Sequence, residues 1–177
     1  MPNTTIRIDL ELTGADIDFF RERLKSAQKK FGSSGEDKII NGAEALIRRI
    51  ESGRLPDFIS PRLTRLREML AMLKDPDWRL EGEDRQHVLN ALSYFADPKD
   101  LVPDSIPGIG LLDDAIMIDL SVIELAPELG GYAEFCANRD ELQRGMPGAE
   151  PLSVARDILQ NRMRRQRRRN VRLGDWG

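Results

Sequence analysis

The amino-acid sequence predicts an all-α protein: a single compact helical domain of about six helices, with a short N-terminal strand or arm and a basic C-terminal helix or tail. Three observations predict this fold class. Apolar residues recur at steps of three and four along most of the chain, which places them on one face of a helix. Only 6% of the 177 residues are aromatic, while 40% are hydrophobic, so the core would consist mainly of helix-favouring aliphatic residues. Glycine and proline separate the periodic segments.

The N-terminal residues suggest two different elements in succession. Residues 5–12 alternate apolar and polar side chains, which is the period of a strand. The first helix is then expected from Thr13 to Phe31, because Thr13 and Asp16 approximate a capping box. Six more helical segments are expected at about 36–52, 61–74, 83–96, 113–126 and 132–142, and from Pro151 into an arginine run. Pro127 is expected to end or kink the fifth of these seven helices.

One stretch carries a recognisable motif. Residues 97–114 read Asp-Pro-Lys-Asp-Leu-Val-Pro-Asp-Ser-Ile-Pro-Gly-Ile-Gly-Leu-Leu-Asp-Asp. This resembles the signature of the YkvA-like domain-of-unknown-function family, roughly Pro-x-Asp-Leu-Ile-Pro-Asp-x-Ile-Pro-x-x-Gly-x-x-Asp-Asp, with Val102 as a mild change. The resemblance implies a helical domain of the kind found in small bacterial proteins, and it implies no common activity. With this resemblance, the chain divides into an arm or strand (1–12), an N-terminal helical part (13–80), a YkvA-like helical core (81–145) and a C-terminal helix with an arginine-rich tail (146–177).

The motif has a structural interpretation and a chemical one. As structure, it is a corner between two helices, in which Asp113 caps the second helix and Asp114 sits in its first turn, where negative charge is favoured. Four apolar side chains would then plug the core: Leu101, Ile106, Ile109 and Leu112. As chemistry, four carboxylates would converge and bind a divalent cation such as magnesium or manganese. The candidate metal ligands are Asp100, Asp104, Asp113 and Asp114, and they would serve a metal-dependent hydrolase.

The charge of the chain is unevenly distributed. The formal net charge is −3, yet residues 161–172 contain seven arginines and no acid, which leaves −10 for the rest. Such a basic segment could bind nucleic acid or another anion through phosphate contacts, although no aromatic residue is interleaved for base stacking. The alternatives are a solvated end or a tail that docks on another copy. The candidate anion-binding residues are Arg162, Arg164, Arg165, Arg167, Arg168, Arg169 and Arg172.

The remaining reactive side chains do not indicate a catalytic site. The chain has one histidine, His87, and one cysteine, Cys136, which excludes an internal disulfide and a zinc site built from these two residue types alone. We expect His87 to be packed in its helix and Cys136 to be a buried, inert thiol. A single cysteine favours a reducing compartment, and no segment has the pattern of an export signal or a membrane span.

These observations predict a cytoplasmic helical module for protein interaction or regulation, without catalysis. Its partner would be an unknown protein or a second copy of the chain, and charge complementarity from the arginine run would mainly affect the association rate and specificity. The two alternatives are the metal-dependent hydrolase that uses the Asp cluster, and nucleic-acid binding through the arginine-rich tail. Beyond a divalent cation in the first alternative, no cofactor is expected.

Overall fold

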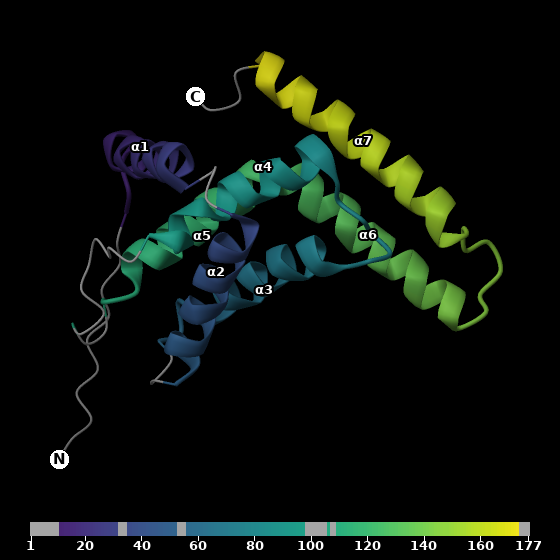
Figure 1. The fold of residues 1–177 in the computed structure, drawn as a ribbon, viewed down its shortest axis with the longest axis horizontal. Coiled ribbons are helices and arrows are strands. Elements are labelled where there is room, and N and C mark those ends of the chain that lie inside the picture. The colour runs from purple at the N-terminus through teal and green to yellow at the C-terminus, as the bar shows by residue number, and fades with distance from the viewer. Residues whose placement is uncertain (1–10, 32–34, 53–55, 98–105, 107–108, 174–177) are drawn as a thin grey trace.

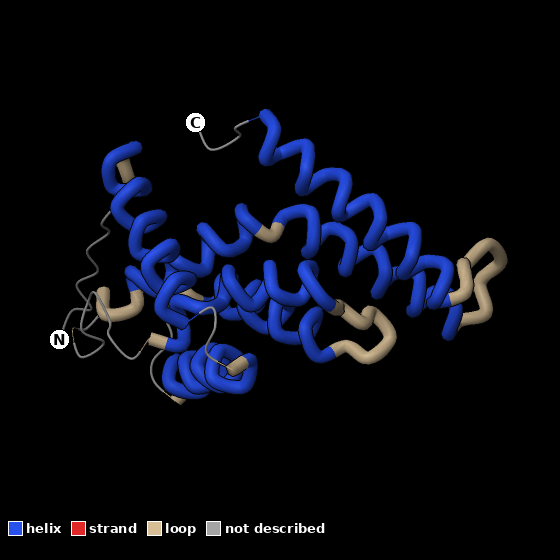
Figure 2. Tube along the Cα trace, turned by 45° about the horizontal axis from the view of Figure 1, so that its top comes forward, coloured by secondary structure: helices blue, strands red, loops and turns tan. Residues whose placement is uncertain are grey.

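The computed structural model describes residues 11–31, 35–52, 56–97, 106 and 109–173. Within these residues the chain forms α-helices, one 3-10 helix and no strand (Figure 2). The all-α prediction is therefore confirmed for the described part of the chain, whereas the predicted strand or arm lies largely outside it. The elements are α1 (Gly14–Phe31), α2 (Glu36–Glu51), α3 (Ser60–Lys74), α4 (Gly82–Leu92), η1 (Ser93–Ala96), α5 (Leu112–Glu124), α6 (Ala126–Gln143) and α7 (Leu152–Leu173).

Local sequence signals explain where several helices begin. The Asp16 carboxylate accepts hydrogen bonds from the Thr13 backbone N–H at 2.9 Å and from the Thr13 hydroxyl at 2.6 Å. The Asp16 N–H donates in return to Thr13 Oγ1 at 3.4 Å, which completes the predicted capping box. Pro61 occupies the first turn of α3, a position that needs no backbone donor.

The predicted start of the sixth helix was wrong. The expected boundary was Tyr132, but α6 begins at Ala126, separated from α5 only by Leu125. The helix α5 already ends at Glu124, and Pro127 lies in the first turn of α6, where its fixed φ angle suits a helix. Trp78 packs beside this early part of α6: a Cβ on Gly131 would stand 3.6 Å from the indole ring.

The core lies among α2, α3, α4 and α5 and continues between α6 and α7. The periodic apolar residues of the helix predicted at about 61–74 form a leucine stripe on α3 that is buried throughout: Leu63, Leu66, Leu70 and Leu73. Trp78, which follows α3, is completely buried against Phe135 of α6. The four apolar motif side chains that were expected to plug the core differ in outcome. Ile106 is 40% exposed and Ile109 is 46% exposed, so the prediction was wrong for these two. Leu112 is half-buried, and Leu101 lies outside the described residues.

Helices α6 and α7 form an antiparallel pair that projects from the rest of the fold (Figure 1). The arginine-rich segment is thus part of a long packed helix. The C-terminal end of α7 returns towards α1, and residues of both helices line one shared cavity. None of the helices in the described part of the chain is long and apolar enough to span a membrane.

Candidate functional site

The structure describes only some of the aspartates of the motif. Asp113 and Asp114 lie in the first turn of α5 and are almost fully buried. The Tyr94 hydroxyl donates a hydrogen bond to Asp113 at 3.2 Å, and Arg49 lies 3.4 Å from an Asp114 oxygen. Burial, together with the two carboxylates, holds the pKa of Tyr94 far above its ordinary value. Both carboxylates therefore have roles within the fold.

The proposed convergence of four aspartates stays a prediction. Asp100 and Asp104 lie outside the described residues. The prediction that Asp113 caps the second helix was wrong: α5 begins at Leu112 with Leu111 as its N-cap, and Asp113 lies inside the first turn. Among the residues that the structure describes, no group of three or more His, Cys, Asp or Glu side chains could hold a metal ion. The metal-dependent alternative has no further support from the described residues.

The arginines of α7 are divided between two faces of the helix. On the inner face, Arg164 Nε lies 2.6 Å from an oxygen of Asp84 in α4. Arg167 spans two helices, because it contacts the other Asp84 oxygen at 2.6 Å and Glu128 of α6 at 2.7 Å. Gln160 adds a hydrogen bond to the Trp78 carbonyl at 2.6 Å. These contacts join α7 to both α4 and α6.

The carboxylates of this inner network are the residues that sequence reasoning missed. Asp84 is 4% exposed and Glu128 is completely buried, and a buried carboxylate without a partner is costly. Burial acts to lower the pKa of Arg167, but its hydrogen bonds to Asp84 and Glu128 outweigh that effect and raise it. No local pattern marks these partners, since Arg167 is separated from them by 83 and 39 positions in the chain.

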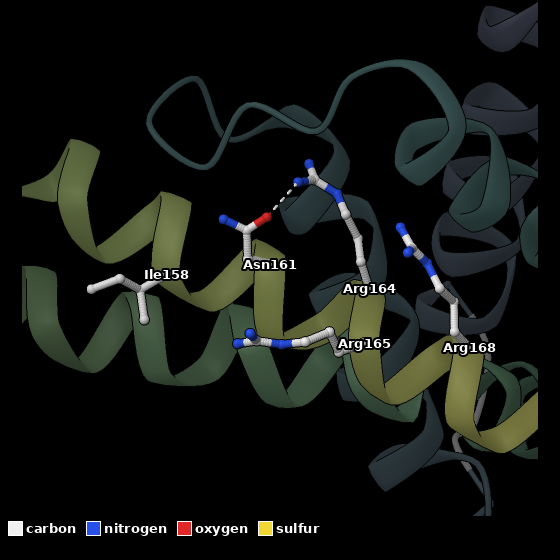
Figure 3. A pocket seen from close by; sticks show the side chains of 5 residues that line it. All are labelled: Ile158, Asn161, Arg164, Arg165 and Arg168. Atoms are coloured by element: carbon white, nitrogen blue, oxygen red, sulfur yellow. Dashed lines mark hydrogen bonds between the residues drawn. The ribbon is translucent and has the colours of Figure 1, made fainter.

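The outer face of α7 carries a stripe of exposed residues at steps of four and three. We call this set the outer stripe; its members are Val154, Ile158, Asn161, Arg165 and Arg168. Four of them, with Arg164 at their edge, line a surface hollow of about 370 Å³ (Figure 3). The stripe lies opposite the buried residues Ala155, Leu159 and Met163, as the rotation of about 100° per residue requires.

The outer arginines have no acidic partners among the described residues. Arg165, Arg168 and Arg169 are exposed and make no ion pair there. Arg162, by contrast, lies 2.5 Å from Glu134 of α6. Arg172 belongs to α7, but its side chain is outside the described part of the structure. The predicted anion-binding set therefore contains residues with two different environments, and its binding role stays a prediction.

A second feature is a cavity of about 800 Å³ between α1, α5 and the C-terminal part of α7. His87 and Glu124 line it. Burial lowers the pKa of His87 in spite of the nearby Glu128 carboxylate, whereas burial and that same carboxylate raise the pKa of Glu124. Perturbed titratable groups beside a cavity are typical of ligand sites.

The lone cysteine lies away from this cavity. Cys136 is half-buried on α6, where Arg139 approaches its sulfur at 3.6 Å. Glu128, the neighbour of His87, is eight residues earlier on the same helix, which corresponds to about 12 Å along the axis. The structure therefore does not bring His87 and Cys136 together as a nucleophile and its base.

Comparison with known proteins gives one finding. A family model described as "Protein of unknown function (DUF1232)" matches residues 88–120, which run from the second half of α4 through η1 to most of α5. Neither a search of curated proteins nor a search of solved structures finds a match. The central segment is thus similar to an uncharacterised family, while the more specific YkvA-like resemblance stays a prediction.

Proposed function

We propose that the protein is a helical interaction module that binds an acidic, amphipathic helix of a partner protein through the outer stripe of α7. The observation that carries the proposal is the composition of this stripe. Its first two members are apolar and exposed, with Val154 at 41% and Ile158 at 54%, and its C-terminal members are arginines. The alternating steps of four and three residues are those of a helix that pairs with another helix.

The two ends of the stripe would contribute differently to binding. Burial of Val154 and Ile158 against apolar side chains of the partner would supply affinity in proportion to the area removed from water. The arginines would pair with carboxylates at the edge of the contact, which mainly raises the association rate and fixes the register. Arg165 and Arg168 are available for this role because the described residues offer them no acid.

The same composition favours a helix over a nucleic acid. A phosphate backbone would pair with the arginines but would leave Val154 and Ile158 in water. No aromatic side chain lies on the stripe to stack on a base, and stacking is a regular part of single-strand binding. A partner that is apolar at one end of its face and acidic at the other would cover all five residues.

The proposal is tested with a synthetic helical peptide whose face presents leucines opposite the apolar end of the stripe and glutamates opposite the arginines. Binding of the fluorescent peptide to the full chain is measured by anisotropy at about 50 mM and about 300 mM salt. We expect the glutamate peptide to bind, more weakly at high salt, and a peptide with lysine in place of glutamate not to bind. Ile158→Ser should weaken binding about fivefold or more, given the surface that this side chain still exposes.

The controls separate this proposal from its rivals. The double variant R165Q/R168Q should weaken peptide binding, whereas R48Q/K29Q removes two exposed charges elsewhere and should not. The proposal would be overturned in favour of nucleic acid by a protein that binds a DNA duplex but not the peptide. In that case R165Q/R168Q would weaken DNA binding and I158S would not. Dimerisation in sedimentation that I158S abolishes, again without peptide binding, would identify a second copy as the partner instead.

A further inference from the structure

We propose that the cavity between α1, α5 and α7 binds a small amphipathic amine, that is, a molecule with a primary ammonium group and an apolar tail. This inference is independent of the function proposed for the outer stripe, which lies on the opposite face of α7. The volume of about 800 Å³ falls within the range of roughly 300–1,000 Å³ that is common for small-molecule sites.

The walls of the cavity suit an apolar tail. Side chains from four helices contribute aliphatic surface along it: Leu24, Leu120, Ile123, Pro127 and Val171. Ile123 is 56% exposed, an unusual state for an isoleucine on a helix whose other face is core. A hydrocarbon chain laid against this wall would be favoured by about 25 cal/mol for each Å² of apolar surface removed from water.

The rim of the cavity carries charges that cancel in pairs. On α1, Arg21 lies 3.4 Å from Asp18, and Lys25 lies 2.8 Å from Glu22. Arg167 also lines the cavity, but it is already bonded to two buried carboxylates. The Glu124 carboxylate is therefore the lining charge without a cationic partner in the described part of the chain, which favours a positively charged ligand.

The inner end of the cavity offers hydrogen-bond acceptors. Gln28 lines the cavity near Glu124 and acts to lower its pKa against the effect of burial, and the carboxylate keeps lone pairs for a ligand. Burial lowers the pKa of the neighbouring His87, which also lines the cavity. Its Nε2 atom is buried and lies 3.7 Å from a carboxylate oxygen of Glu128, so Glu124 is the acceptor that faces a ligand.

An ammonium group matches these acceptors better than other polar groups do. It brings three N–H donors and a positive charge, so that it would pair with the Glu124 carboxylate. An alcohol offers one donor and no charge. A carboxylate offers only acceptors and would be repelled by Glu124. The site should therefore discriminate among amphipathic molecules by their head group.

Isothermal titration of the full chain with octylamine, octanol and octanoate tests the proposal. We expect octylamine to bind saturably at one site, and the other two to bind about tenfold more weakly or not at all. Glu124→Gln keeps the shape but removes the charge, and it should weaken octylamine binding about tenfold or more. Glu150→Gln, at an exposed residue that does not line the cavity, is the matched control and should change the affinity less than about twofold.

A second pair of variants guards against effects on folding. Ile123→Trp places a larger side chain at the cavity wall and should abolish octylamine binding, whereas Phe19→Trp alters an exposed residue that does not line the cavity and should leave binding intact. Equal binding of the three head groups, or octylamine binding that survives both E124Q and I123W, would overturn the proposal. E124Q should not change binding of the acidic peptide to α7, so failure of one proposal does not imply failure of the other.

Discussion

Asp84 and Glu128 show how single buried charges connect α7 to the rest of the fold. Neither carboxylate has appreciable contact with water, and both depend on arginines that come from α7. Replacing such a network with apolar residues of similar size need not destabilise a protein, but removing one partner leaves the other charges buried and uncompensated. The arginines of the inner face are thus structural.

This difference between faces leads to a prediction for Arg167 and Arg165. Arg167→Gln should lower the free energy of unfolding by about 3–5 kcal/mol, because Asp84 and Glu128 lose a charged partner. Arg165→Gln, two residues earlier on the exposed face, should change it by less than about 0.5 kcal/mol. Urea unfolding followed by circular dichroism measures both. Equal effects of the two substitutions would contradict the division of the arginines.

Glu124 gives a prediction about pH. Its pKa is raised in the folded protein but returns to about 4.5 on unfolding. As the pH rises above this value, the unfolded chain loses the proton first, so the wild type loses stability. Glu124→Gln has no such proton to lose, and its stability relative to the wild type should grow between about pH 4 and about pH 7. A pH-independent difference would show that Glu124 ionises as freely in the folded state.

At the scale of elements, glycines reveal where helices approach each other closely. A Cβ on Gly42 of α2 would stand 2.9 Å from the carbonyl carbon of Phe95, and this neighbour is backbone of η1, which cannot rotate away. Gly130 of α6 has no neighbour within 4 Å of such a Cβ. The two positions thus have opposite requirements, although both lie inside helices.

The prediction is a pair of alanine substitutions with opposite signs. Gly42→Ala should destabilise the protein by about 1–3 kcal/mol or more, because α2 must move away from η1. Gly130→Ala should stabilise it by about 0.5–1 kcal/mol, since alanine loses less backbone entropy in a helix. Thermal unfolding distinguishes the two. A neutral Gly42→Ala would mean that the α2–η1 contact is loose.

Local patterns in the sequence were sufficient for some elements and not for others. The Thr13–Asp16 capping box and the leucine stripe of α3 depend on residues within a few positions of each other, and both predictions are confirmed. The start of α6 was misplaced because Pro127 was expected to end or kink a helix, whereas it lies in the first turn of the next one, where a proline is tolerated. The packing of Trp78 against Phe135 of α6 is a long-range contact that no local pattern marks.

The candidate sites also differ in whether a local sequence pattern could have predicted them. The outer stripe could have been found from the sequence, because the steps from Val154 to Arg168 mirror those of Ala155, Leu159 and Met163 on the other face. The meeting of His87, Glu124 and Glu128 could not, since it requires the packing of α4 against α5 and α6. Asp84 gave no signal either: acids in the first turn of a helix, such as Glu83 and Asp84, are typically solvated and are favoured by the helix dipole.

For the whole molecule, the separation into an acidic body and a basic end is partly cancelled by folding. Arg164 and Arg167 neutralise buried carboxylates, and Arg162 pairs with Glu134. The positive field that a partner meets therefore comes from a smaller set of outer arginines than the sequence suggests. These outer arginines are presented by a packed helix, which lowers the entropy cost of forming a specific contact.

Because the inner arginines hold α7 to the rest of the fold, deleting the arginine run should unfold part of the protein as well as remove charge. A chain that ends at Gln160 loses the buried Met163 and both inner arginines, so Asp84 and Glu128 lose their arginine partners. Removal of Arg167 alone is expected to lower the free energy of unfolding by about 3–5 kcal/mol. We expect the truncation to lower it by at least as much. The variant R165Q/R168Q/R169Q removes exposed charge only and should unfold at nearly the wild-type temperature. Thermal unfolding of the two proteins side by side decides the matter. A truncated chain as stable as the full one would mean that the C-terminal part of α7 contributes nothing to the fold. If the truncated chain is destabilised as expected, its loss of binding would not report on charge. The contribution of charge to binding is then measured with the triple variant.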